Sequence, residues 1–199
     1  MIFGDKKKFA LEFEFDEFYK NDFVALGTYC LYINGFCYGE KSPSHSWFGG
    51  VVFGFKKLLS EKKNYGPLFS QYSDLEIIKT IWHFLWDVPF PSAEKIIEDD
   101  DKIFLGMKGR DFRNAFYNLS NRSEAHFDDG SNILLFNNDK LVKLLGYRDL
   151  GLDETEDVVI GDVNSIIIPR KEFYDIIQES FDYILSQRDE AVKNGNACK

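Results

Sequence analysis

The sequence predicts an α+β domain in which helices pack on one face of a largely antiparallel sheet. Residues 9–15 read FALEFEF, and their apolar residues alternate with others as in a strand that has one buried and one exposed face. Strand-like segments come first in the chain, and mixed helical and strand-like segments follow. This order is typical of α+β domains.

The first forty residues predict an antiparallel β-meander. Residues 24–33 read VALGTYCLYI and are rich in β-branched and aromatic residues, which favour strands. Asn34-Gly35 follows, and this pair favours a two-residue type I′ turn. Residues 36–39 would then return as the next strand of the meander.

Three longer helices are expected further along the chain. Residues 51–62 suit a helix, although Gly54 interrupts it. Ser73 and Glu76 have capping-box spacing, and apolar residues follow them at helical intervals. Pro169 can open a last helix, because proline is tolerated at a helix start. The apolar stripe of that helix comprises Phe173, Ile176, Ile177, Phe181, Ile184 and Leu185.

The remaining segments are expected to be short. The pattern predicts strands at 103–107, 133–136 and 163–168, a helix at 140–145 and a loop at 153–157, and leaves 110–128 ambiguous. We see no repeat and no linker, so residues 1–199 are expected to form a single domain. The polar residues from about 189 to 199 are expected to be a flexible tail.

The charge of the chain favours some partners over others. Its 199 residues contain 24 Lys and Arg against 33 Asp and Glu, a formal net charge of −9. Such a charge opposes direct binding to nucleic acid or to an anionic membrane, and it favours a basic partner. Solubility alone explains it equally well. With no secretory signal and no long apolar run, we expect a cytoplasmic protein that is a monomer or weak dimer.

Two of the three cysteines lie in the stretch CLYINGFCYG. A turn at Asn34-Gly35 would make Cys30 and Cys37 diagonal neighbours, roughly 7–8 Å apart, so a disulfide would be strained. A zinc site would need two further ligands, and none has motif spacing. We therefore expect thiols without chemistry, and we assign no catalytic residue, no cofactor and no metal ligand.

Acidic stretches are the candidate partner-binding residues. Each could equally be a solvated surface, and the sequence does not show that the stretches meet in space. The candidates are Glu12, Glu14 and Asp16 on one face of the first strand, Asp99, Asp100 and Asp101, and Asp153, Glu154, Glu156 and Asp157.

The opening MIFGDKKKFALEFEFDE and the hairpin YINGFCYG resemble the start of immunity protein 42, a bacterial family. The resemblance covers about the first forty residues well, and beyond them it extends to length and general pattern. Members are small cytosolic proteins encoded beside polymorphic toxins, including those of contact-dependent growth inhibition. The resemblance implies binding and blocking of a cognate toxin domain, and it implies no catalytic residues. Many such toxins are basic nucleases, which an acidic inhibitor would suit.

Three functional hypotheses follow. The first is an immunity protein that occludes the active site of its toxin. The second is a small metal-assisted hydrolase that uses His126, Asp128 and Asp129, which form an H-x-D-D cluster. The third is a general intracellular protein-interaction module.

Overall fold

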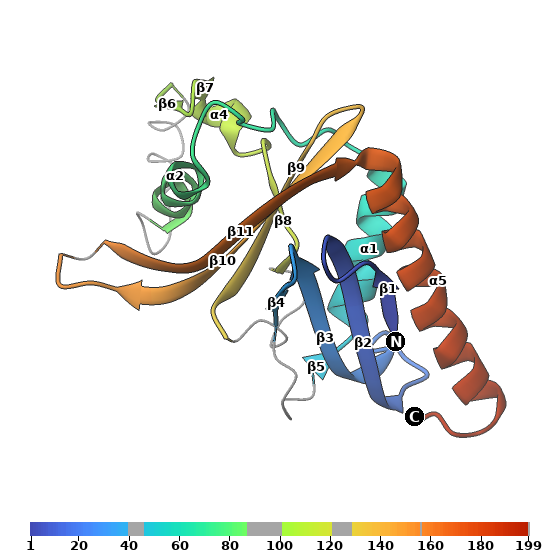
Figure 1. Ribbon diagram of the computed structural model, residues 1–199. Coiled ribbons are helices and arrows are strands. Elements are labelled where there is room, and N and C mark those ends of the chain that lie inside the picture. Colours follow the sequence, from blue (N-terminus) through green and yellow to red (C-terminus); the bar gives the residue numbers. More distant parts are fainter. Residues whose placement is uncertain (40–45, 87–100, 121–128, 156, 199) are drawn as a thin grey trace.

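In its described residues, the protein folds into two large antiparallel sheets and a small two-stranded one, with helices packed against the large sheets, as the computed structural model in Figure 1 shows. The structure describes residues 1–39, 46–86, 101–120, 129–155 and 157–198. The helices are α1 (Gly49–Glu61), α2 (Asp74–Trp86), α4 (Gly109–Phe112) and α5 (Arg170–Lys193). The strands are β1 (Ile2–Gly4), β2 (Phe9–Phe18), β3 (Ala25–Ile33), β4 (Phe36–Tyr38), β5 (Ser46–Trp47), β6 (Ile103–Phe104), β7 (Met107–Lys108), β8 (Tyr117–Asn118), β9 (Ser131–Asn137), β10 (Leu141–Leu152) and β11 (Val158–Pro169).

The first sheet is the predicted N-terminal meander. Its strand order is β1-β2-β3-β4, with β5 also paired to β3. Asn34 and Gly35 both have positive φ, 51° and 83°, as a type I′ turn requires. Ile33 therefore pairs with Phe36, and Tyr32 with Cys37. The α+β class and the meander are confirmed.

The second sheet has the order β11-β10-β9-β8, and most of its central residues are buried on both faces. Ile133 and Leu135 face one apolar cluster, whereas Leu134 and Phe136 face another. This arrangement explains why β9 reads as a continuous apolar run and does not alternate. The second sheet is therefore the wall between two cores.

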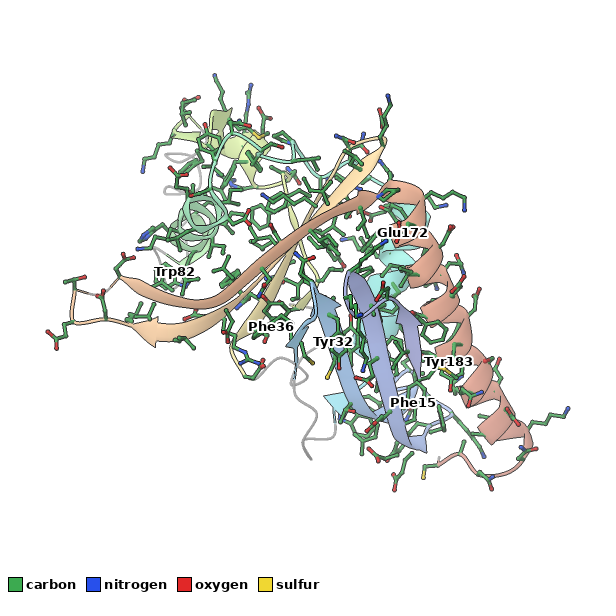
Figure 2. The ribbon with its side chains drawn as sticks, viewed as in Figure 1. Phe15, Tyr32, Phe36, Trp82, Glu172 and Tyr183 are labelled. Carbon is green, nitrogen blue, oxygen red and sulfur yellow. The ribbon has the colours of Figure 1, made fainter. Side chains whose placement is uncertain are left out.

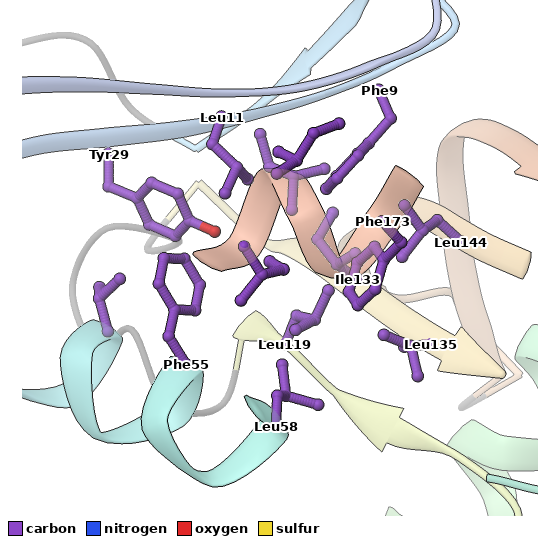
Figure 3. Close-up of a cluster of buried hydrophobic side chains, with 14 of the residues drawn as sticks. Phe9, Leu11, Tyr29, Phe55, Leu58, Leu119, Ile133, Leu135, Leu144 and Phe173 are labelled. Carbon is purple, nitrogen blue, oxygen red and sulfur yellow. The ribbon is translucent and has the colours of Figure 1, made fainter. Parts of the chain in front are cut away.

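We call the two cores the large cluster and the small cluster. The large cluster lies between the first sheet, the second sheet, α1 and α5, and Figure 3 shows part of it. Its members include Phe9, Leu11, Phe13, Tyr29, Leu31, Val51, Phe55, Leu58, Ile133, Leu135, Val142, Leu144, Ile168, Phe173 and Ile177. The small cluster packs α2 and α4 on the other face of the second sheet. Its members are Phe69, Ile77, Ile78, Ile81, Phe112, Ala115, Leu134, Phe136, Leu145 and Tyr147.

The predicted helix starts are confirmed for α2 and α5. In α2 the Ser73 hydroxyl accepts the Glu76 N–H at 3.3 Å, and the Glu76 carboxylate accepts the Ser73 N–H at 2.8 Å. This is the reciprocal capping box. Pro169 directly precedes the first residue of α5. The expected helix at 51–62 is α1, which also begins close to its predicted position.

Two segment predictions were wrong. Residues 140–145 are not a helix: residues 141–145 lie in β10, whose run of buried residues has no clear period because both of its faces are covered. Residues 103–107 are not one strand. They form the β6–β7 hairpin around Leu105 and Gly106, which both have positive φ.

The stretch left ambiguous contains two short elements, and the chain end contacts the first sheet. Residues 109–112 form the single turn α4 and residues 117–118 the short strand β8, while 121–128 lie outside the described residues. Helix α5 continues to Lys193, and the Cys198 N–H donates to the Phe18 carbonyl at 2.8 Å. The last residues thus have a backbone partner in the first sheet, which their polar composition did not reveal.

The two sheets meet where Tyr38 packs on Gly146. The Tyr38 hydroxyl donates to the Asp162 carbonyl at 2.5 Å and accepts from the Asn164 amide at 3.1 Å. Burial raises the pKa of Tyr38 to about 12. A Cβ at Gly146 would lie 2.4 Å from a ring carbon of Tyr38. Gly146 is therefore needed for the close approach of β4 and β10.

We expect Gly146→Ala to lower the free energy of unfolding by about 1–3 kcal/mol, because the added methyl must displace a fully buried ring. Urea unfolding followed by circular dichroism measures this. In a Tyr38→Ala background the ring is gone, so the same substitution should cost much less. An equal cost in both backgrounds would contradict the packing argument.

Candidate partner-binding surface

The candidate acidic residues of β2 have different environments. The Glu12 carboxylate accepts hydrogen bonds from the Lys6 ammonium at 2.9 Å and from the Tyr32 hydroxyl at 2.6 Å. The hydrogen bond to Glu12 raises the pKa of Lys6. Glu12 therefore joins β2 to β3 and to the preceding turn. Glu14 and Asp16 are exposed.

A β-bulge interrupts the predicted alternation of the first strand. Phe15 pairs with Gly27 and Glu17 with Leu26, so Asp16 is the extra residue on β2. An extra residue breaks the period of two, and the expectation that Glu12, Glu14 and Asp16 share one face does not hold past Phe15.

The second acidic stretch contributes one described residue. Asp101 is exposed at the start of the β6–β7 hairpin, with the Lys108 ammonium 3.9 Å from its carboxylate. Asp99 and Asp100 lie outside the described residues.

The third acidic stretch forms the tip of the β10–β11 hairpin. We call residues 148–162 the arm. Asp153 accepts the Thr155 N–H and hydroxyl, both at 2.7 Å, and the Asp157 N–H at 3.1 Å. The hydrogen bonds from Thr155 are the main reason that the pKa of Asp153 is lowered. Glu154 is exposed, and Glu156 lies outside the described residues.

These stretches do not form one patch. In Figure 1 the tip of the arm lies at the far left, whereas β2 lies at the lower right. Figure 2 shows the same separation between Trp82, beside the arm, and Phe15 and Tyr32 on the first sheet. Among the candidates that the structure describes, Asp153, Glu154 and Asp157 lie together in one loop. Whether any of the candidates binds a partner stays a prediction.

Helix α2 holds the arm through polar contacts. The Trp82 indole N–H donates to the Asp149 carboxylate at 3.1 Å, and the Lys79 ammonium lies 2.5 Å from the Asp157 carboxylate. His83 Nε2 lies 3.4 Å from the same carboxylate. Sequence reasoning missed these anchors. The available signal was the spacing of 79, 82 and 83, which places the three side chains on one face of a helix.

Arg148 anchors the base of the arm. Its guanidinium lies 3.1 Å from the carboxylates of Asp129 and Asp162. It also lies over the Phe36 ring, 5.4 Å from the ring centre. These contacts join the arm to the first sheet and to the start of β9.

Asp129 belongs to the cluster of the hydrolase hypothesis, and here its carboxylate contacts Arg148 and accepts the Ser131 N–H. His126 and Asp128 lie outside the described residues. Within the described ranges, no group of three or more His, Cys, Asp or Glu side chains is arranged to hold a metal ion.

The cysteine pair has the expected strand register. Tyr32 lies opposite Cys37, and the Cys30 thiol is 3.8 Å from the Gly39 carbonyl oxygen. Cys30 is buried, Cys37 is half-buried, and no disulfide joins these two described residues.

In the part of the chain that the structure describes, no helix is long and apolar enough to cross a membrane.

Comparisons with known proteins identify a matching family and a solved structure with a similar fold. The family model described as immunity protein 42 matches residues 1–183. Among solved structures, the crystal structure of CdiI from Burkholderia dolosa AUO158 is similar, with a TM-score of 0.54 and 14% sequence identity. The likeness covers 92% of this chain and 99% of that chain, so the fold is shared over nearly the whole length. No curated protein matches the chain.

We expect Lys79→Met to raise the pKa of Asp157 toward its ordinary value, because the hydrogen bond from the Lys79 ammonium is the main cause of the lowered pKa. Because the pKa is lowered in the folded state, this contact stabilises the fold fully at pH values above the unfolded-state pKa of about 4. This stabilisation is lost as the pH falls through the folded-state pKa. An NMR titration of the Asp157 carboxyl measures it.

Lys171→Met is the matched control, since it removes an ammonium 2.5 Å from Asp175 on another surface. It should leave the pKa of Asp157 unchanged. An Asp157 titration that is the same in wild type and Lys79→Met would contradict the anchor.

Proposed function

Because the chain belongs to the immunity protein 42 family, we propose that it binds a cognate bacterial toxin domain and neutralises it by occluding the active site. The family match over residues 1–183 is the observation that supports this function. The proposal places the protein in the cytoplasm of the cell that makes the toxin, as a monomer or weak dimer. It also assigns the chain no catalytic reaction.

The proposed partner is a basic, nuclease-like toxin domain. The formal net charge of −9 supports this choice, because complementary charge speeds association and orients the two surfaces. A toxin that binds nucleic acid must present cations around its substrate channel. An acidic protein seated on that channel would exclude the substrate by charge as well as by volume.

Occlusion requires binding alone. At an inhibitor concentration 100 times Kd, about 1% of the toxin stays unbound by mass action. Surfaces on a rigid scaffold suit this task, since little conformational entropy is lost on docking. The proposal takes the chain as one domain, because the large and small clusters share the second sheet.

The test is co-expression with the toxin domain encoded beside this gene. We expect cells that make both proteins to grow, cells that make the toxin domain alone to die, and the purified proteins to form a complex in size-exclusion chromatography. Growth arrest despite co-expression, together with no association of the purified proteins, would overturn the proposal.

We expect the double variant Cys30→Ala, Cys37→Ala to neutralise the toxin as the wild type does, apart from a stability loss of about 1 kcal/mol from the packing of buried Cys30. Growth in the co-expression assay and a thermal unfolding curve measure the two effects. A folded double variant that fails to protect would show that the thiols take part in the function.

A further inference from the structure

We propose that the arm is the segment that enters the partner, with its exposed aliphatic face seated in the channel of a basic toxin domain. This inference rests on the proposed function and names the surface and the partner chemistry. It is supported by the reach of the arm, its exposed aliphatic side chains, its anchoring and its charge.

The arm extends past the sheet that supports it. Strand β9 pairs with β10 only as far as Ser131, which lies opposite Arg148. Beyond that point, in the part of the chain that the structure describes, β10 pairs with β11 alone, out to Leu152 opposite Val158. Figure 1 shows this two-stranded segment projecting from the rest of the molecule. A projecting hairpin can enter a concave site that a flat sheet cannot.

Large aliphatic side chains are exposed on the arm. Leu150 is 60% exposed, Leu152 56% and Val159 38%. Leu150 lies across Gly161, where a Cβ would come within 2.8 Å of the leucine side chain. Val159 is two residues from Gly161 and therefore on the same face of the strand. Leu150 and Val159 thus form one aliphatic surface.

This aliphatic surface faces away from α2. Asp149 binds Trp82, and Ile160 packs against the small cluster, so these two paired residues face the helix. Val159 and Gly161, the chain neighbours of Ile160 on β11, alternate to the opposite face. The register of β10 shifts between Asp149 and Leu152, and the side chain of Leu150 lies on this same opposite face because it packs across Gly161. The α2 contacts therefore hold the arm without using the aliphatic surface.

Contacts within the chain hold the described residues of the arm without a partner. Contacts from Trp82 and Lys79 hold one face, Arg148 holds the base, and the Asp153 carboxylate holds the turn. Ordering that is already present in the unbound protein need not be supplied on association. Exposed aliphatic side chains on a fixed hairpin can thus act as anchors.

The charge of the arm favours a basic toxin domain as its partner over a second copy of this chain. Residues 148–162 contain six carboxylates and one cation, Arg148. A second copy of this chain, with a net charge of −9, would be repelled by them. A basic channel is attracted, and its rim cations would meet the carboxylates while Leu150 and Val159 contact its floor.

The test compares two variants that each replace exposed aliphatic strand residues by threonine. Leu150→Thr, Val159→Thr removes the aliphatic surface, and threonine still favours strands. Ile167→Thr is the matched control, because Ile167 is 48% exposed on β11 but lies outside the arm. Kd is measured by surface plasmon resonance against an inactivated toxin domain, and circular dichroism checks that each variant is folded.

We expect the arm variant to weaken binding at least tenfold, mainly through faster dissociation, and Ile167→Thr to change Kd by less than twofold. Hydrogen exchange of the wild type should show that the toxin domain protects the amides of residues 149–160. Glu154→Gln should slow association at low salt and leave dissociation almost unchanged.

The outcomes separate this inference from the proposed function. If the wild type neither binds nor protects, the proposed function fails. If the wild type binds and protects, but the arm variant binds equally well and residues 149–160 gain no protection, only the arm inference fails. It also fails if sedimentation shows a wild-type dimer that the arm variant abolishes, since a second copy would then be the occupant.

Discussion

The burial of the second sheet on both faces is the constraint on which the rest of the structure depends. One face completes the large cluster with the first sheet, α1 and α5, and the other supports α2 through the small cluster. Because α2 is fixed on this second face, Lys79, Trp82 and His83 are positioned to reach the arm. The projecting hairpin thus owes its orientation to the packing of the sheet from which it extends.

The same constraint explains which parts of the fold the sequence could predict. β2 alternates because only one of its faces lies in the large cluster, and the Asn34-Gly35 turn and the Ser73–Glu76 capping box are local signals that need no tertiary context. β10 gives no such signal. Within its apolar run, Lys143 is buried, and its ammonium lies 2.7 Å from the Asp74 carboxylate. A charged residue inside an apolar run suggests the spacing of an amphipathic helix, although here the charge is paired in the core. Because the start of β10 was interpreted as a helix, the second sheet was not predicted.

The candidate surface could be predicted only in part. The carboxylates of Asp153, Glu154 and Asp157 are visible in the sequence, and they do lie at the projecting end of the β10–β11 hairpin. Leu150 and Val159 look like ordinary strand residues, because their exposure depends on where β9 stops pairing with β10. That end point is a long-range property of the sheet. The distances between the three acidic stretches are likewise set by tertiary packing, and no local pattern indicates them.

The ion pairs of the arm determine how much charge and how much apolar burial contribute to binding. Asp157 is paired with Lys79, and Asp162 with Arg148, so the field at the tip is weaker than six carboxylates suggest. Exposed pairs of this kind contribute little to affinity, and the remaining charge acts mainly on the rate and orientation of encounter. Binding strength must then come from burial of apolar surface, which on the arm is supplied by Leu150 and Val159. An arm with carboxylates alone would speed association with a basic partner but would bind it only weakly.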